Sequence, residues 1–508
     1  MPQLKLHFSL FTLILSSFAL NAQRNSTGGD EQYRPQVHFS PKEKWINDPN
    51  GMVYHNGIYH LFYQYHPFSS VWGPMHWGHA TTKDLIHWNR EPIKIFPDSL
   101  GTIFSGSAVV DKSNTSGFGK NGVIPLVAIF TQHKEEAKKT GKNYFQHQSI
   151  AYSLDNGKTW TKYSGNPVLK SPGIPDFRDP KVMWHEPTKK WIMSLAVVDR
   201  IFFYSSPDLK NWNKESEFGD SAGAHGGVWE CPDLFSLEYN GKEVWVLIVN
   251  LNPGGPNKGS GTQYFLGDFD GKNFLPYSRE TKWLDYGPDN YAGITWSNTG
   301  KRKIFLGWMS NWTYAELVPT ETWRSSMTIP RDLRIVKIGD EMFVASTIVK
   351  ESSTIKSRSV VANNVALSKP FEIAAKTESV KLPCLLNISM DVTKHFSITL
   401  TNDSGEELIV GYDKLNNQYF IDRSKSGNTG FHKEFAAKHL APRFTTASKM
   451  DVSLLIDVSS VELFGDNGLT VMTEIFFPTK PYTKILAKST EGAVIKRIEY
   501  IGMKSIWK

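Results

Sequence analysis

Short runs of β-branched and aromatic residues, separated by Gly, Asn, Asp and Pro, follow one another along most of the chain. Such runs are typical of β-strands, and the longer 3.6-residue periodicity of amphipathic helices is absent. The sequence therefore predicts an all-β protein. The clearest strand candidates are Ile58 to Tyr65, Val123 to Thr131, Trp191 to Val197, Val244 to Asn250 and Lys303 to Trp308.

One turn pattern recurs, in which an aspartate is followed four or five residues later by an aromatic residue. Its four copies end at Trp88, Trp160, Trp212 and Phe274, so they lie 72, 52 and 62 residues apart. A four-stranded propeller blade with its loops takes about 40–50 residues. The repeat favours a propeller with insertions, in which the aromatic residue begins each outer strand. Ordinary hairpin turns in an irregular sandwich are the alternative.

The composition changes beyond about residue 340. Of the 16 tryptophans, 15 lie before this point and one, Trp507, lies after it. Ser, Thr, Lys and Val become more frequent, and Asp466 to Gly468 forms a D-N-G hairpin signal. We therefore predict two domains, a propeller over residues 33–338 and a β-sandwich over residues 345–508. Any aromatic-lined site belongs to the first domain.

Charge and targeting signals narrow the class of protein. The net charge of +7 on 508 residues is modest and forms no basic stripe, so nucleic-acid binding is not indicated. Residues Met1 to Ala22 resemble a secretory signal peptide, which predicts export to a bacterial periplasm or the medium; a buried first helix is the alternative. No cysteine follows that could carry a lipid anchor, and no later run predicts a membrane span.

The two cysteines, Cys231 and Cys384, exclude a disulfide scaffold and a Cys-based zinc module. We find no metal-ligating cluster or cofactor motif, so neither a metal nor a cofactor is predicted. The Gly-rich stretch from Asn252 to Gly271 lacks the ending of a phosphate-binding loop. The oligomeric state is left open.

Three acidic residues have unusual neighbours: Asp48 in W-I-N-D-P-N-G, Asp179 in F-R-D-P and Glu230 in W-E-C-P-D. Each has a proline and an aromatic residue close by, and proline helps to hold a neighbouring side chain at a strand end. A single D-P pair is more simply a turn. Three such acids on separate blade-sized segments are instead expected to meet at the axis, where the first strands of all blades converge.

A pair of carboxyl groups is what glycoside hydrolysis requires, one to attack the anomeric carbon and one to protonate the leaving oxygen. The amides of Asn47 and Asn50 are expected to hold Asp48 ionised. Glu230 lies between Trp229 and Cys231, apolar neighbours that suit a group that must stay protonated. Arg178 is expected to keep Asp179 ionised, as an acceptor for sugar hydroxyls.

The three motifs, in this order and spacing, resemble the signatures of glycoside hydrolase family 32, the β-fructofuranosidases. Further matches include H-L-F-Y-Q-Y-H-P, F-S-G-S and G-W-M-S-N-W, and they cover nearly the whole chain after residue 22. The resemblance implies a five-bladed β-propeller followed by a C-terminal β-sandwich, and retention of anomeric configuration. It also implies that Asp48 is the nucleophile, that Glu230 is the general acid and base, and that Asp179 stabilises the transition state. The implied substrate-binding residues are Trp45, Asn47, Gln64, Trp72, Phe104, Ser105, Arg178 and Trp312.

The Gly-rich loop is similar to that of levanases and exo-inulinases in this family. We therefore expect exo-release of fructose from levan or inulin, with sucrose also cleaved. An endo-levanase, a fructosyltransferase and a non-catalytic fructan-binding protein are alternatives, and an arabinan-cleaving enzyme is disfavoured by W-I-N-D-P-N-G. The choice between β-2,6 and β-2,1 linkages is left open.

Overall fold

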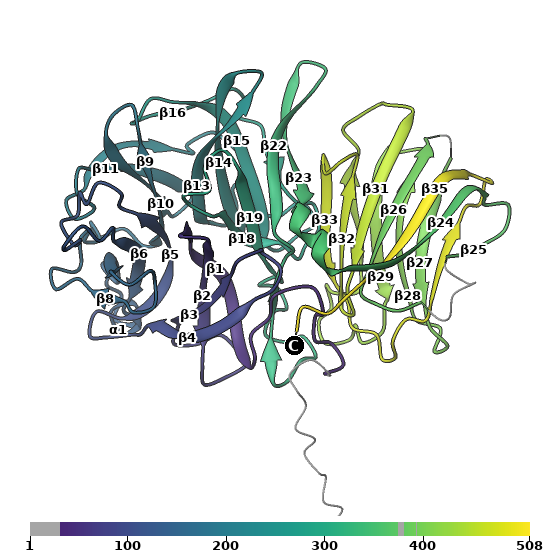
Figure 1. The fold of residues 1–508 in the computed structure, drawn as a ribbon, viewed down its shortest axis with the longest axis horizontal. Helices are drawn as coiled ribbons and strands as arrows, with labels where there is room; N and C mark the ends of the chain where they lie inside the picture. The colour runs from purple at the N-terminus through teal and green to yellow at the C-terminus, as the bar shows by residue number, and fades with distance from the viewer. Residues whose placement is uncertain (1–30, 374–379, 393, 508) are drawn as a thin grey trace, which may run out of the picture.

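The computed structural model describes residues 31–373, 380–392 and 394–507, and it confirms the all-β prediction. Within these residues the helices are α1 (Glu135–Lys139) and the 3₁₀ helix η1 (Lys350–Ile355). None of the described helices is both long and apolar enough to cross a membrane. The expected signal peptide, Met1 to Ala22, lies outside the described residues. Two bodies of sheet lie side by side, with the N-terminal sheets on the left of Figure 1.

Five sheets make up the N-terminal body, each mainly antiparallel and, apart from β20, built from consecutive strands. The first holds β1 (Lys44–His55), β2 (Ile58–His66), β3 (His76–Thr82), β4 (Asn89–Ile95) and β20 (Trp323–Arg324), and the second β5 (Thr102–Val110), β6 (Leu126–His133), β7 (Gln146–Ser153) and β8 (Thr161–Lys162). The third holds β9 (Phe177–His185), β10 (Lys190–Val197), β11 (Arg200–Ser206) and β12 (Asn213–Phe218). The fourth holds β13 (Val228–Tyr239), β14 (Lys242–Asn252), β15 (Gly261–Phe269), β16 (Phe274–Pro276) and β17 (Lys282–Trp283), and the fifth β18 (Tyr291–Thr295), β19 (Lys303–Met309), β21 (Ser326–Met327), β22 (Arg331–Ile338) and β23 (Glu341–Ile348).

The first strand of each sheet lies on a common axis. β1 contacts β5, β5 contacts β9, β9 contacts β13, β13 contacts β18, and β18 contacts β1 again. The strand β20, which comes near the C-terminal end of the propeller sequence, pairs in parallel with the start of β1 and so links the two ends of the ring. This is the arrangement of a propeller, and it brings residues that are distant in sequence to one place.

The aspartate–aromatic repeat marks the turn between the third and fourth strands of the first four sheets. Asp84, Asp155, Asp208 and Asp270 each accept hydrogen bonds from backbone N–H groups two to four residues later. The side chain thus forms the turn itself, and the aromatic residue stands at the start of the outer strand. The repeat was therefore a structural signal rather than a functional one.

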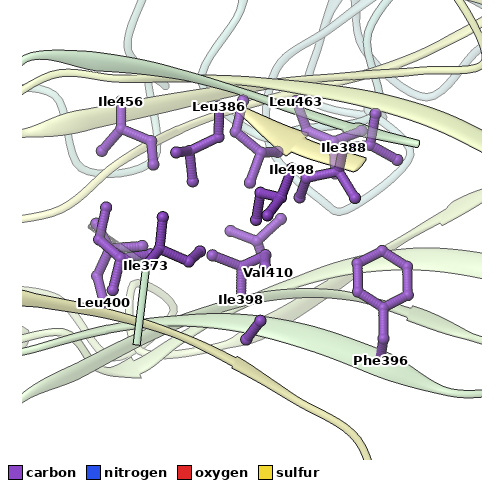
Figure 2. Close-up of a cluster of buried hydrophobic side chains, with 14 of the residues drawn as sticks. Ile373, Leu386, Ile388, Phe396, Ile398, Leu400, Val410, Ile456, Leu463 and Ile498 are labelled. Carbon is purple, nitrogen blue, oxygen red and sulfur yellow. The ribbon is translucent and has the colours of Figure 1, made fainter. Parts of the chain in front are cut away.

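Two six-stranded sheets form the C-terminal body, and their facing side chains make one apolar core, part of which Figure 2 shows. One sheet holds β24 (Lys356–Ala366), β26 (Cys384–Asp391), β31 (Lys449–Ile456), β32 (Ser460–Gly465), β33 (Thr470–Ile475) and β35 (Val494–Met503). The other holds β25 (Phe371–Glu372), β27 (Phe396–Thr401), β28 (Glu407–Asp413), β29 (Gln418–Lys425), β30 (Lys438–Pro442) and β34 (Lys484–Lys488). This is the sandwich predicted from the sequence.

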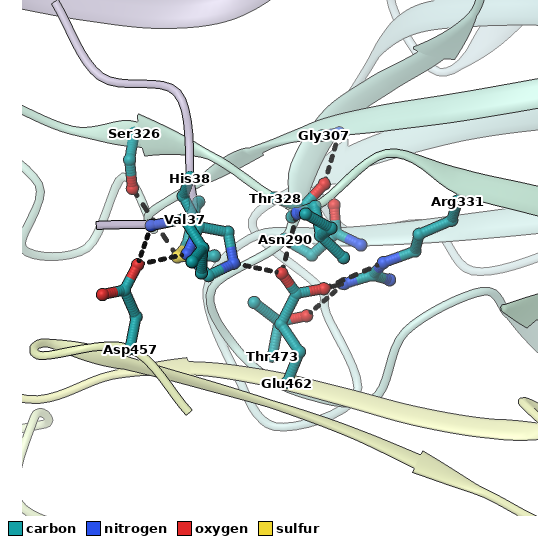
Figure 3. Close-up of polar contacts among 12 residues, drawn as sticks. Val37, His38, Asn290, Gly307, Ser326, Thr328, Arg331, Asp457, Glu462 and Thr473 are labelled. Atoms are coloured by element: carbon teal, nitrogen blue, oxygen red, sulfur yellow. Dashed lines mark hydrogen bonds and ion pairs between the residues drawn. The ribbon is translucent and has the colours of Figure 1, made fainter. Parts of the chain in front are cut away.

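Buried charges join the two bodies (Figure 3). The ring nitrogens of His38 lie 2.8 Å from Asp457 Oδ2 and 2.8 Å from Glu462 Oε1 of the sandwich. Arg331 of β22 donates to Glu462 and, over 2.8 Å, to Asp285 Oδ2. All of these side chains are fully buried. Burial favours neutral His38, but the hydrogen bonds and charges of its two carboxylate partners raise its pKa to about 9.

The stabilising effect of His38 should therefore disappear in alkali. A histidine whose pKa is higher in the folded chain stabilises fully below its unfolded pKa of 6.5 and loses that effect as the pH rises through about 9. We expect the difference in unfolding free energy between the wild type and His38→Gln to narrow by about 3 kcal/mol over this range. Denaturant titrations at several pH values measure it. A difference that stays constant with pH would show that His38 carries no charge in the fold.

Candidate active site

A cavity of about 180 Å³ opens where the innermost strands of the propeller begin. Ten of the eleven site residues predicted from the sequence line it, including the three carboxylates from β1, β9 and β13. The lining consists of Asn47, Asp48, Gln64, Trp72, Phe104, Ser105, His133, Lys138, Gln146, Asp176, Arg178, Asp179, Glu230 and Trp312.

Each innermost strand has a break in its pairing register, and those of β1, β5, β9 and β13 lie at or next to residues that line the cavity. The breaks lie between Ile46 and Pro49 in β1, between Ile103 and Gly106 in β5, and between Glu230 and Asp233 in β13. A β-bulge of this kind turns side chains out of the regular alternation. The prolines of the motifs thus mark bulges inside strands, rather than the strand ends expected from the sequence. The corresponding breaks in β9 and β18 fall around Asp179 to Pro180 and Ala292 to Gly293.

Three of these bulges place a residue other than glycine in the left-handed region of backbone space, and the bulge in β18 does so at Ala292, with φ 54°. Asp179 has φ 65° and Cys231 has φ 43°, and each precedes a proline. Such conformations are uncommon and are retained where the surrounding structure enforces them, often at functional sites. The backbone N–H of Cys231 donates to Asp179 Oδ2 over 3.1 Å, so the two bulges support each other.

Asp48 is held by neutral donors. Ser105 Oγ donates to Asp48 Oδ2 over 2.6 Å, and Asn47 Nδ2 donates to Asp48 Oδ1 over 2.9 Å. Burial and the charge of Glu230 raise the pKa of Asp48, while these hydrogen bonds oppose the rise. The side-chain amide of Asn47 donates to the Asp48 carboxylate, as expected. The side-chain NH₂ of Asn50 instead donates to the backbone carbonyl of Asp48.

Asp179 differs from the expectation that Arg178 keeps it ionised. Burial raises the pKa of Asp179 to about 7; Arg178 opposes this rise, and the charges of Glu230 and Asp48 add to it. The guanidinium lies 3.8 Å from Asp179, whereas its hydrogen bonds go to Glu230 and Asp176. The arginine next in sequence is therefore not the closest partner of Asp179, because adjacent residues of an extended chain point to opposite sides.

Glu230 is not in the apolar setting that its neighbours in sequence suggested. Arg178 Nη2 donates to Glu230 Oε1 over 2.9 Å, and the Tyr291 hydroxyl donates to Oε2. Trp229 is buried in a separate core cluster, and Cys231 Sγ lies 3.5 Å from Asp48 Oδ2 and 3.7 Å from Asp179 Oδ2. The thiol thus faces the other two carboxylates.

Comparison with known proteins decides the family. The model "Glycosyl hydrolases family 32 N-terminal domain" matches residues 38–346, and the model "Glycosyl hydrolases family 32 C terminal" matches residues 346–502. The chain belongs to glycosyl hydrolase family 32. It is a glycoside hydrolase whose catalytic propeller and C-terminal sandwich are those of this family.

Individual relatives are similar over most of their length. A levanase of Bacillus subtilis is 45% identical over 98% of this chain and 74% of its own. The extracellular exo-inulinase of Aspergillus niger is 39% identical over 94% of this chain and 96% of its own. The crystal structure of the exo-inulinase from Aspergillus awamori superposes with a TM-score of 0.86 at 36% identity, covering 94% of this chain and 100% of that one. A fructofuranosidase of Schwanniomyces occidentalis in complex with fructose gives 0.85 at 32% identity, covering 94% and 99%.

Trp45 is a correction to the expected set of family 32 pocket residues. It is fully buried, does not line the cavity, and packs on Trp308 and Trp312. Its indole N–H donates to Asn47 Oδ1 over 2.8 Å, which turns the Asn47 NH₂ towards Asp48. Trp45 therefore lies behind the cavity wall and contacts the cavity residue Asn47.

Several residues of the site had not been singled out from the sequence. His133 stacks on Phe104 with ring centroids 4.3 Å apart, and Lys138 reaches the cavity from α1. His133 ends β6 and Lys138 lies in the connection between β6 and β7, and neither belongs to a motif. Asp176 directly precedes Phe177, so the F-R-D-P string extended by one residue towards the N-terminus would have included it.

The two cysteine thiols should be unreactive in the folded protein. Both are free and buried. Burial raises the pKa of both thiols, and the neighbouring carboxylates raise that of Cys231 further. Titration with a thiol reagent at mildly alkaline pH should find neither thiol before unfolding and both of the chain's two thiols afterwards. Fast reaction of Cys231 in the native enzyme would contradict the burial of its thiol.

Proposed function

We propose that this chain hydrolyses β-D-fructofuranosyl bonds and releases fructose from the ends of levan or inulin chains and from sucrose. The observation that carries the proposal is the meeting of Asp48, Asp179 and Glu230 in one cavity. The levanase and exo-inulinase relatives support fructans as substrates. The cavity is small beside ordinary ligand clefts of roughly 300–1,000 Å³, which favours one terminal sugar unit over an internal stretch of chain.

Asp48 acts as the nucleophile in this proposal. Its carboxylate attacks the anomeric carbon, the bond to the glycosidic oxygen breaks, and a covalent fructosyl-enzyme forms. The hydrogen bonds from Ser105 and Asn47 support this role, because neutral donors orient the carboxylate without pairing its charge.

Glu230 gives its proton to the leaving oxygen and then accepts a proton from the water that attacks the fructosyl-enzyme. That second step releases fructose and restores ionised Asp48, so no proton is gained or lost over the cycle. Glu230 is more exposed than Asp179, which suits a group that meets both the leaving sugar and the incoming water. Tyr291 and Arg178 orient its two oxygens.

Asp179, together with Arg178, binds the hydroxyl groups of the fructosyl unit and stabilises the transition state. A carboxyl group with a pKa of about 7 can both accept and donate hydrogen bonds near neutral pH. Gln64 Nε2, which has no partner among the described residues, supplies a further donor. Trp72, Phe104 and Trp312 provide apolar walls.

We also propose that the protein is exported, on the pattern of Met1 to Ala22 and on its similarity to an extracellular enzyme. The sequence predicted a propeller over residues 33–338 and a sandwich over residues 345–508. Because the strand β23 pairs with β22 along its whole length, we propose instead that the propeller continues to Ile348 and that the sandwich begins after it.

Parallel incubation with levan, inulin and sucrose, followed by sizing of the products, tests the proposal. We expect free fructose alone at early times, with Asp48→Asn as the matched inactive control. A ladder of fragments would instead show endo-cleavage, and growing oligofructosides at high sucrose would show transfer. Binding without any cleavage would remove the hydrolase assignment.

Glu230→Gln tests the role of the acid. Its rate on sucrose should fall by about a hundredfold or more, while fructosyl fluoride, whose leaving group needs no proton, should lose less than about tenfold in the first step. Glu186→Gln, a change at an exposed turn after β9, is the control and should affect neither substrate. Equal losses on both substrates would contradict general-acid catalysis by Glu230.

A further inference from the structure

Three large aromatic side chains stand exposed beside the cavity. Phe68 is 73% exposed, Phe96 53% and Trp72 39%. Single exposed apolar residues are common on proteins, but neighbouring ones mark surfaces that bind something. These three belong to the first sheet of the propeller and to its loops.

Strand register places them at the cavity end of that sheet. His66, at the end of β2, pairs with Trp45 near the start of β1, and His76, at the start of β3, pairs with Tyr65. Ile95, at the end of β4, pairs with Trp77. Phe68 follows β2 and Phe96 follows β4, so both leave the sheet at the edge where the cavity lies.

Ring contacts connect the outer residues to one another. The centroid of Phe96 lies 5.8 Å from that of His76, and the centroid of His76 lies 5.9 Å from that of Phe68. Phe68 in turn lies 6.0 Å from His66. All three contacts are edge-to-face, an arrangement that holds each ring in place.

His66 joins this group to the cavity wall. Its Nδ1 lies 2.8 Å from the carbonyl oxygen of Val71, and its ring packs so closely on Gly73 that a Cβ there would approach it to 2.4 Å. Trp72, between these two residues, lies 6.2 Å from Phe104 of the cavity, centroid to centroid. Its backbone N–H donates to Glu316 Oε1 over 3.0 Å, which fixes the loop.

We propose that this aromatic track, formed by Phe104, Trp72, Phe68 and Phe96, binds the second and later sugar units of a fructan chain whose terminal unit occupies the cavity. The inference rests on the proposed function. Because the cavity suits one unit, the rest of a polymer must leave over the rim. On this side the rim offers flat apolar rings, which the C–H faces of sugars cover favourably. Continuity with the cavity is what selects a fructan chain as the occupant over a protein partner.

The test compares a polymer with sucrose, which has a single unit outside the cavity. For Phe68→Ala and for Phe96→Ala, the ratio of kcat/KM on the better polymer, levan or inulin, to kcat/KM on sucrose should fall about fivefold. A fall of this size corresponds to the loss of some 40 Å² of apolar ring surface that the bound polymer would otherwise cover. Phe68→Trp should restore or raise the ratio. Leu415→Ala, which removes an 85% exposed side chain of the sandwich, is the matched control and should leave the ratio at its wild-type value.

An unchanged ratio in both alanine variants would overturn the proposal. So would a fall in the ratio accompanied by loss of a dimer in light scattering, since the residues would then serve contact between two copies. If the wild type cleaves sucrose but neither polymer, the track has no such role. A wild type that cleaves no fructoside at all would refute the proposed function itself, and this inference with it.

Discussion

Crowding of carboxyl groups around a single guanidinium is the constraint on which the site depends. Arg178 contacts Asp176, Asp179 and Glu230, and only 11% of its side chain is exposed. Asp48 lies close enough for Glu230 to raise its pKa, yet its hydrogen bonds come from the neutral groups of Ser105 and Asn47. The cation thus steadies the groups proposed to bind hydroxyls and move protons, and the proposed nucleophile keeps its charge unpaired.

The propeller meets this constraint with one strand for each acid. The innermost strands form a closed ring, and a bulge in each turns side chains towards the axis. Left-handed backbone at Asp179 and Cys231 belongs to these bulges and is held by the hydrogen bond between them. The sandwich contributes from outside the ring, because its Asp457 and Glu462 enclose His38 shortly before β1 begins. The segment that delivers Asp48 is thereby anchored in both domains.

Much of this organisation follows from patterns that can be seen in the sequence. Composition showed two all-β domains, and the aspartate–aromatic repeat identified four equivalent turns. Motifs pointed to ten residues that line one cavity. The predictions that were wrong are those that took the surroundings of a side chain from the residues next to it in the sequence. Arg178 donates a hydrogen bond to Glu230 and lies farther from Asp179. The Cys231 thiol faces Asp48, and Trp45 donates a hydrogen bond to Asn47 from outside the cavity. In extended and bulged chain, adjacent residues point to different sides, so their environment comes from other strands. Tyr291 and His133 reach the site from strands without a motif.

The most direct test of the account is to trap the fructosyl-enzyme. The enzyme is mixed with sucrose, quenched with acid within one turnover and digested, and the peptides are weighed by mass spectrometry. We predict that the peptide containing Asp48 gains the mass of one fructosyl unit and that the gain is absent in Asp48→Asn. A fructosyl unit on the peptide of Asp179 or of Glu230, with Asp48 unmodified, would contradict the assignment of the nucleophile.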